Sequence, residues 1–281
     1  MKVEPVASDS LGVRSMATYV ETKDCKIFID PSAALGPKRY GLPPSSKEKE
    51  KLKEIKEKIA EKAKKCDILT ISHYHYDHFE LETSLYNDKK VFAKDIKQNI
   101  NYSQTKRGKK LKDKIEEKCR LIYADNSSHK FGDTEIHFSP GFFHGPENVK
   151  LGYVIMATIK DKDKKMVHSS DVQGPVTKQA TDYIIKQKPD LLIMDGPPTM
   201  LLGWRFSKQN LQDASNNLNR IIDETNCEVI LDHHLLRDLK YKEKFSEPYQ
   251  RFEDKIKTFA EYIGEKNNTL EAYRKKLWGK I

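Results

Sequence analysis

A run of metal-binding side chains directly after a short apolar segment is the feature that most constrains the fold of this chain. Residues 68–71 read Ile-Leu-Thr-Ile, which is typical of a buried strand, and the four polar side chains that follow are His73, His75, Asp77 and His78. Imidazole nitrogens suit zinc, and a carboxylate oxygen can share the same ion. A six-residue segment cannot wrap four ligands around one ion without severe strain. Two neighbouring ions, each held by a pair of these side chains, are the easier geometry, and such a centre can activate a water.

The His-x-His-x-Asp-His pattern resembles the signature of the metallo-β-lactamase-fold superfamily. The resemblance implies further ligands downstream in a set order: a lone histidine, an aspartate after a strand, and a histidine after a late strand. Candidates occur in that order at His144, at Asp171 and at the pair His233 and His234. The resemblance therefore extends from about residue 30 to residue 234, and the order of the motifs is more specific than any one of them.

Carried over position by position, the resemblance implies two metal positions that share one bridging carboxylate and a water. The first ion is held by His73, His75 and His144. The second ion is held by Asp77, His78 and one of the pair His233 and His234. Asp171 bridges the two ions, and Asp77 is also the residue to which we assign a catalytic role. Adjacent side chains on an extended strand diverge, so we expect one histidine of the last pair, with His233 favoured, to be the ligand. The other then orients ligands or contacts substrate.

Several other polar side chains lie close to these segments in the sequence. Asp30 ends the strand expected at residues 26–29, where family members often have an aspartate that hydrogen-bonds near the ligands. His168 is expected to be structural. The loop at residues 195–199 is expected to line the pocket without an assignable chemical role. Five further side chains are candidates for contact with the substrate: Arg14, Tyr74, Tyr76, Asp232 and Arg237.

The pattern of apolar residues predicts an α/β fold of one domain over residues 1–281. A strand at 26–29, a helix at 46–65 and a strand at 67–71 form a βαβ unit, because Leu52, Ile55, Ile59 and Ala63 give the helix one apolar stripe. A β-rich middle follows, with a hairpin turn at 161–164, and then strands at 190–194 and 227–231 around a helix at 207–225. The order matches the αββα four-layer sandwich of the superfamily, with a helical C-terminal tail at 249–278.

Composition bears on the location of the protein, the state of its cysteines and its binding partners. No apolar run is long enough for a membrane span, and the first residues lack the apolar core of a secretion signal, so we expect a cytoplasmic protein. The four cysteines, Cys25, Cys66, Cys119 and Cys227, contain no C-x-x-C pair and are expected to be reduced. The net charge of +9 permits nucleic-acid binding but does not favour it, because most of the excess is lysine mixed with glutamate along helices. The oligomeric state stays open.

The ligand types favour two divalent ions, with zinc first and iron or manganese as alternatives. Members with a di-iron redox centre usually carry an acidic residue where this chain has His75, and a flavin domain follows, so hydrolytic chemistry is favoured. The predicted substrate is a small ester, lactone, thioester or phosphodiester. A nuclease or phosphodiesterase is the alternative, which lysine and arginine clustered around the mouth of the site would favour. A non-catalytic metal-binding protein is a third hypothesis. Segments 169–175 and 231–238 resemble a mostly archaeal branch of the superfamily, for which the resemblance implies fold and metal but no substrate.

Overall fold

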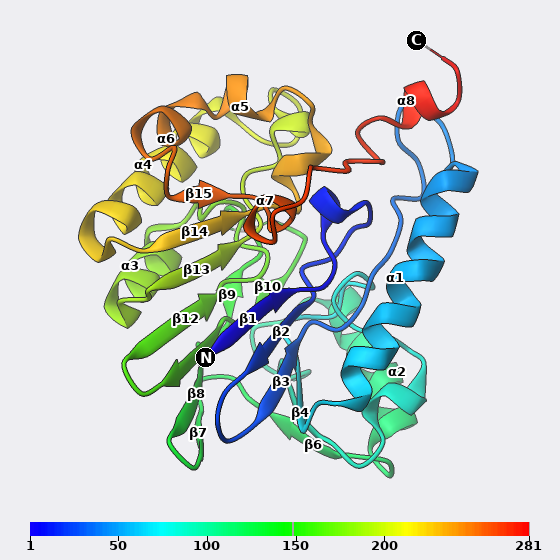
Figure 1. The fold of residues 1–281 in the computed structure, drawn as a ribbon, viewed down its shortest axis with the longest axis vertical. Helices are drawn as coiled ribbons and strands as arrows, with labels where there is room; N and C mark the ends of the chain where they lie inside the picture. Colours follow the sequence, from blue (N-terminus) through cyan, green and yellow to red (C-terminus); the bar gives the residue numbers. More distant parts are fainter. Residues whose placement is uncertain (148, 281) are drawn as a thin grey trace.

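Two β-sheets lie face to face between two groups of helices in the computed structural model, which describes residues 1–147 and 149–280 (Figure 1). The first sheet has the strand order β1 (Lys2–Pro5), β2 (Thr18–Glu21), β3 (Lys26–Ile29), β4 (Ile68–Ile71), β5 (Lys90–Ala93) and β6 (Arg120–Tyr123). The second has the order β15 (Ile256–Lys257), β14 (Glu228–Leu231), β13 (Leu191–Met194), β12 (Lys164–His168), β11 (Ala157–Asp161), β8 (Thr134–Phe138) and β7 (Ser128–Phe131). A separate two-stranded ribbon pairs β9 (Phe142–Phe143) with β10 (Tyr153–Val154).

The helices cover the outer faces of the two sheets. Helices α1 (Ser46–Lys64) and α2 (Tyr102–Ile115) lie on the first sheet, and α3 (Lys178–Gln187) and α4 (Lys208–Thr225) lie on the second (Figure 1). Short helices follow at α5 (Tyr241–Lys244), α6 (Ser246–Arg251), α7 (Phe259–Tyr262) and α8 (Arg274–Leu277), and single 3₁₀ turns occur at η1 (Asp9–Leu11), η2 (Thr83–Tyr86), η3 (Thr199–Leu201) and η4 (Leu235–Arg237). The four-layer α/β arrangement predicted from the sequence is confirmed.

Side chains that alternate along the strands build three apolar layers. Ile55 and Ile59 of α1 pack with Leu69 and Ile71 of β4 outside the first sheet. The intervening residue Ile68 points the other way, into the layer between the sheets. A third layer joins the second sheet to α3 and α4. Because both faces of β3 and β13 are largely buried, these two strands read as nearly continuous apolar runs in the sequence.

The strands that precede the candidate ligands run parallel and end at the same edge. β3 and β4 are parallel neighbours in the first sheet, and β12, β13 and β14 are parallel neighbours in the second. The β11–β12 hairpin, with Asp161 paired to Lys164, forms as predicted. Loops beyond the carboxyl ends of parallel strands are where α/β sheets gather binding residues. This edge is therefore where the chain brings together segments that are distant in the sequence.

The C-terminal tail is where the predicted fold was wrong in detail. Instead of one or two terminal helices over residues 249–278, the tail contains the end of α6, the two-residue strand β15, and the four-residue helices α7 and α8. Ion pairs attach it to the body: Arg274 with Glu48 of α1, Glu271 with Arg14, and Arg251 with Asp223 of α4. Glu48 also completes the capping box of Ser45 at the start of α1. The tail was misread because these contacts, rather than a helical stripe, hold it.

Replacing Glu271 with glutamine is expected to lower the free energy of unfolding by about 2–3 kcal/mol at pH 7. Both carboxylate oxygens of Glu271 accept hydrogen bonds from Arg14, at 2.6 Å each. Burial raises the pKa of Glu271, but Arg14 outweighs it and brings the pKa to about 2. A carboxyl with a lowered folded-state pKa contributes stability above its unfolded pKa, near 4.3, and loses it as the pH falls through about 2. The difference between the two proteins in urea unfolding is therefore expected to fall to about half at pH 3.

The exposed Glu253 supplies the matched control, since Glu253→Gln is expected to change the unfolding free energy by less than about 0.5 kcal/mol at either pH. A Glu271→Gln deficit that stayed constant from pH 7 to pH 3 would show that lost packing, not the ion pair, carries the effect.

Two further expectations concern disulfide bonds and membrane-spanning helices. None of the four cysteines, all of which lie within the described residues, forms a disulfide. Over residues 1–147 and 149–280, no helix combines the length and the apolar content that crossing a membrane requires. The cytoplasmic location stays a prediction.

Candidate metal centre

Each candidate ligand lies in a loop that leaves the carboxyl end of a strand. His73, His75, Asp77 and His78 follow β4, Asp171 follows β12, and His233 and His234 follow β14. His144 follows the short strand β9 of the separate ribbon. His73, His78, His144, Asp171 and His233 are almost completely buried, whereas His75, Asp77 and His234 are partly exposed. The structure thus brings all eight sequence-predicted side chains to one place.

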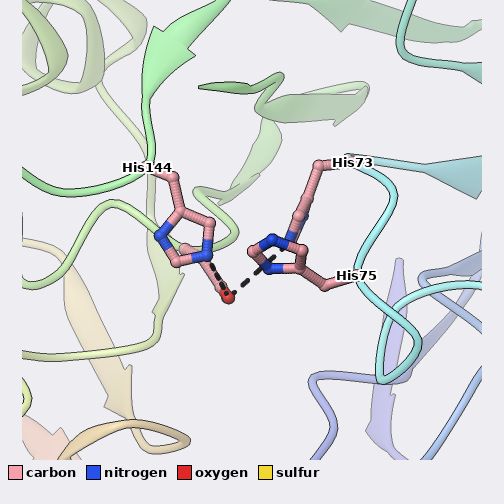
Figure 2. Close-up of side chains that lie close together, drawn as sticks. His73, His75 and His144 are labelled. Atoms are coloured by element: carbon pink, nitrogen blue, oxygen red, sulfur yellow. Dashed lines mark ion pairs between the residues drawn. The ribbon is translucent and has the colours of Figure 1, made fainter. Parts of the chain in front are cut away.

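One carboxylate oxygen, Asp171 Oδ2, lies at the centre of this cluster. Five imidazole Nε2 atoms surround it, at 3.0 Å for His144, 3.3 Å for His78, 3.6 Å for His233, and 3.7 Å for His73 and for His234. Figure 2 shows His73 and His75, from one loop, turned toward His144, which comes from a separate segment. A carboxylate surrounded in this way has the position that a ligand shared by two cations needs.

The side chains fall into groups whose ligand atoms lie within 4.8 Å of one another. One group is His73, His75, His144 and Asp171, and a second is Asp77, His78 and His233. A third joins Asp171 to His233 and His234. The first two groups match the two metal positions that the resemblance implied, with Asp171 within reach of both.

Unsatisfied polar atoms support the fit of this donor set to metal ions. His73 Nε2, His78 Nε2 and Asp171 Oδ1 are buried and have no hydrogen-bond partner. Buried polar atoms in folded proteins are nearly always paired, and imidazole nitrogens with a carboxylate oxygen are a donor set that zinc accepts. The residues present therefore fit a pair of divalent ions.

The electrostatics of the cluster also suit a cation. Burial lowers the pKa of His75 to about 3, and His144 adds to the shift, so this imidazole is neutral near pH 7 and free to coordinate. Burial raises the pKa of Asp171, but His78 and His233 outweigh it and keep the carboxyl ionised. Burial lowers the pKa of His78, yet Asp171 and Asp30 raise it well above its ordinary value. The space between these two carboxylates thus attracts positive charge.

Three carboxylates orient three of the histidines from behind. His78 Nδ1 lies 2.8 Å from Asp30 Oδ2, His233 Nδ1 lies 2.8 Å from Asp9 Oδ2, and His234 Nδ1 lies 2.6 Å from Asp195 Oδ2. In each case the opposite nitrogen, Nε2, faces Asp171. A carboxylate on the far nitrogen fixes the tautomer and the ring orientation of a metal-binding histidine.

Only one of these three carboxylates was identified from the sequence. The prediction that Asp30 hydrogen-bonds near the ligands is confirmed, and Asp30 also accepts from the backbone and hydroxyl of Ser72. Asp195 was assigned no role, although its position directly after a strand was a usable signal. Asp9 was missed because nothing in the sequence links it to His233, which lies near the other end of the chain.

The expectation that His233 and His234 diverge was wrong. His233 adopts a left-handed backbone conformation with φ of 50°, so the chain has left the extended strand before it reaches His234. The two rings lie with centroids 4.5 Å apart, and both Nε2 atoms face Asp171. His233 groups with Asp77 and His78, as the favoured assignment required, whereas His234 also lines the adjacent cavity.

Asp77 lies at the border between the cluster and this cavity. Its Oδ2 is 3.6 Å from His233 Nε2 and 3.6 Å from Arg237 Nη2. Burial raises the pKa of Asp77, but His78, His233 and Arg237 outweigh it and bring the pKa below its ordinary value. Asp77 is therefore ionised at neutral pH, the form that a metal ligand needs. Its catalytic role stays a prediction.

A cavity of about 680 Å³ opens onto the cluster, which forms its floor through His75, Asp77, His144, Asp171 and His234. Of the residues considered as substrate contacts, Arg14, Tyr76 and Arg237 line this cavity. Tyr74 is buried and donates to the carbonyl of Lys94, and Asp232 accepts backbone hydrogen bonds. His168, expected to be structural, lies 3.0 Å from the carbonyl oxygen of Met16 through its Nε2.

The sandwich and the order of its candidate ligands define a protein of the metallo-β-lactamase fold. Among solved structures, an isothiocyanate hydrolase from Delia radicum gut bacteria aligns over 92% of this chain and 95% of its own, with a TM-score of 0.57 and 14% identity. The Zn²⁺-bound protein PqqB from Methylobacterium extorquens aligns over 92% and 97%, with a TM-score of 0.51 and 10% identity. At these identities the likeness shows the fold alone.

No family model matches the chain, but close relatives do. A UPF0282 protein of Methanocaldococcus jannaschii is 48% identical over 290 residues, covering 99% of this chain and 96% of the relative. A UPF0282 protein of Methanopyrus kandleri is 44% identical over 293 residues, covering 99% of each. The chain therefore belongs to the UPF0282 family, and the archaeal relatives agree with the branch predicted from the sequence.

Proposed function

We propose that this chain is a metal-dependent hydrolase. The observation that carries the proposal is the convergence of five imidazole nitrogens on Asp171 Oδ2, with buried donor atoms left unpaired around it. His73, His75 and His144 would hold one divalent ion, Asp77, His78 and His233 a second, and Asp171 both. Imidazole favours zinc, with iron or manganese as alternatives. When bound, such a pair of ions would supply a water of lowered pKa and a Lewis acid that polarises the substrate oxygen.

The protein's own groups have separate tasks in this proposal. Asp30 and Asp9 hold the rings of His78 and His233 so that Nε2 of each faces the centre. His234, fixed by Asp195 and open to the cavity, would contact the substrate beside the reacting bond.

The charge of the cavity mouth favours the phosphodiesterase candidate over neutral esters and lactones. Lys38, Arg39, Arg107 and Arg205 line the cavity, and none has a carboxylate partner within 4.0 Å among the described residues. Clustered basic side chains raise the local concentration of anionic substrates. A non-catalytic metal-binding role is the third candidate, and the complete ligand set speaks against it, because degenerate members of a metalloenzyme family lose ligands.

Metal content measured by elemental mass spectrometry, together with turnover of two chromogenic substrates, tests this proposal. We expect near two metals per chain and hydrolysis of bis(p-nitrophenyl) phosphate that exceeds hydrolysis of p-nitrophenyl acetate. Turnover of the acetate alone would move the function to small esters. Little metal, not restored by zinc, manganese or iron, would overturn the proposal.

A further inference from the structure

Three arginine–aromatic pairs surround the cavity above the candidate metal centre. The guanidinium carbon lies 4.2 Å from the ring centroid in one pair, 4.5 Å in another and 5.0 Å in the third. The pairs are Arg205 with Trp204, Arg39 with Tyr40, and Arg107 with Tyr76, and all six residues line the cavity. Three of the cation–π pairs recorded among residues 1–147 and 149–280 therefore lie around one cavity.

The arginines of these pairs differ from the two others in the cavity. Arg14 is neutralised by Glu271, and Arg237 by Asp9. Arg39, Arg107 and Arg205 have no carboxylate within 4.0 Å among residues 1–147 and 149–280. Nε of Arg39 is in addition buried without a hydrogen-bond partner. Three positive charges at the mouth are therefore available to an anionic ligand.

The backbone holds two of these arginines in place rather than leaving them as free surface side chains. Arg107 Nη1 donates to the carbonyl of Tyr74 at 3.1 Å, and Arg39 Nη2 donates to the carbonyl of Arg237 at 2.8 Å. Gly108 lets α2 approach the loops after β4 and β5 closely, since a Cβ there would lie 2.5 Å from Ile96 and 2.8 Å from Tyr74. The close approach of this helix brings Arg107 over the cavity.

The aromatic partners keep surface that a ligand can use. Trp204 is 72% exposed, Tyr76 47% and Tyr40 43%. Arg205 covers one face of Trp204, so a flat ligand group can stack on the other face of this ring. The other two rings have second partners, since Lys275 lies 5.0 Å from the Tyr40 centroid and Phe79 stacks on Tyr76. Proteins that bind single-stranded nucleic acid combine cationic side chains for phosphates with exposed aromatic rings for bases. A neutral ester needs neither the cationic side chains nor the aromatic rings, and a small anion needs only the cationic side chains.

We propose that the substrate is a nucleoside phosphodiester, whose phosphates contact Arg39, Arg107 and Arg205 and one of whose bases stacks on Trp204. The inference rests on the proposed hydrolase function. Hydrolysis would break one phosphorus–oxygen bond, placing the hydroxyl of water on phosphorus and the proton on the departing sugar oxygen. The products are a phosphate monoester and an alcohol. A strand of nucleic acid and a dinucleotide share this chemistry. The cavity, with a volume of about 680 Å³, admits a small ligand or a short part of a longer strand.

Binding without turnover tests the inference separately from the hydrolase proposal. The chain has two tryptophans, so Trp278→Phe leaves Trp204 as the only one. In excess chelator, we expect a ten-nucleotide single strand to quench Trp204 fluorescence. The logarithm of the binding constant is expected to fall with the logarithm of the salt concentration with a slope of about −2, because each phosphate contact on a single strand contributes about −0.7.

Charge-neutral variants assign the effect to the cavity. Arg205→Gln and Arg107→Gln are each expected to make the slope shallower by about 0.7, and Trp204→Leu to weaken binding, followed by anisotropy of a labelled strand, at least fivefold. Arg251 is the control outside the cavity lining: it also stacks on an aromatic ring, Phe252, although it pairs with Asp223. Arg251→Gln is expected to leave both quantities unchanged.

A comparison of ligands of different length distinguishes a polymer substrate from a dinucleotide substrate. Tighter binding of the ten-nucleotide strand than of a cyclic or linear dinucleotide supports a polymer substrate, and the reverse order supports a dinucleotide. Equal binding of a polyglutamate peptide, or equal effects of Arg251→Gln and Arg205→Gln, would overturn the inference.

The two proposals can also fail independently of each other. If hydrolysis of bis(p-nitrophenyl) phosphate is present while no nucleotide ligand quenches Trp204, the hydrolase proposal stands and the nucleotide inference fails. If nucleotides bind at the cavity but the metal-loaded protein hydrolyses neither them nor the chromogenic substrates, the ligand class stands and the hydrolase proposal fails.

Discussion

Replacing His75 with alanine is expected to reduce the bound metal from near two to near one ion per chain and to lower hydrolysis by more than about 100-fold. His75 shares its ligand group with His73, His144 and Asp171. Loss of a side chain that only orients a ligand costs 10–100-fold in metal affinity or activity, and removal of a ligand itself costs more. The side chain is partly exposed, so its truncation leaves no closed cavity in the core. Elemental mass spectrometry and steady-state turnover measure the two effects.

The control for this variant is a histidine of the same chain outside the cluster. His137 lies on β8, with its side chain 35% exposed, and contacts Ser128 and Glu135. His137→Ala is expected to retain the full metal content and turnover. Undiminished hydrolysis by His75→Ala would contradict the two-metal assignment, whereas equal losses in both variants would point to a general effect on folding.

Replacing Asp171 with asparagine is expected to have the larger effect, with less than one metal per chain and no measurable hydrolysis. Asp171 Oδ2 lies within 3.7 Å of five imidazole nitrogens, so its charge serves both metal positions. An asparagine has nearly the same shape but carries no charge to offset the repulsion between two dications. Metal titration followed by calorimetry measures the loss for both positions in one experiment.

A surface aspartate tests whether this loss is specific. Asp182 forms ion pairs with Lys178 and Arg220 on the outer helices, and Asp182→Asn is expected to leave metal content unchanged. Circular dichroism of the Asp171→Asn protein is expected to match that of the parent protein without metal. Two tightly bound ions in Asp171→Asn would exclude a bridging role for this residue.

Local sequence patterns were enough to predict the layers of the fold. The apolar stripe of Ile55, Ile59 and Ala63 on α1 predicts burial of one face, and the uninterrupted apolar run of β13 predicts burial of both faces. The C-terminal tail was misread because its short segments are held by distant partners such as Glu48, and no periodicity marks such a contact.

The candidate ligands could also be found from the sequence, because most of them follow a strand whose apolar run is visible. The supporting residues could not be found in this way. Asp9 reaches His233 only because η1 packs against η4. His233 and His234 both face Asp171 only because the backbone turns left-handed at His233. Such features depend on loop conformation, which the pattern of residue types does not specify.

The sequence by itself determined the set of candidate ligands, their order and the two-sheet core, since strand burial and the placement of polar residues at strand ends are local properties of the chain. Only the tertiary structure decided which carboxylate orients which histidine and which arginine side chains gather at the mouth of the cavity. Arg39, Arg107 and Arg205 belong to three segments far apart in the sequence, and they meet at one cavity because the two sheets pack with their ligand-bearing edges together. The charge of the whole chain, spread over helices, carries no trace of that local concentration.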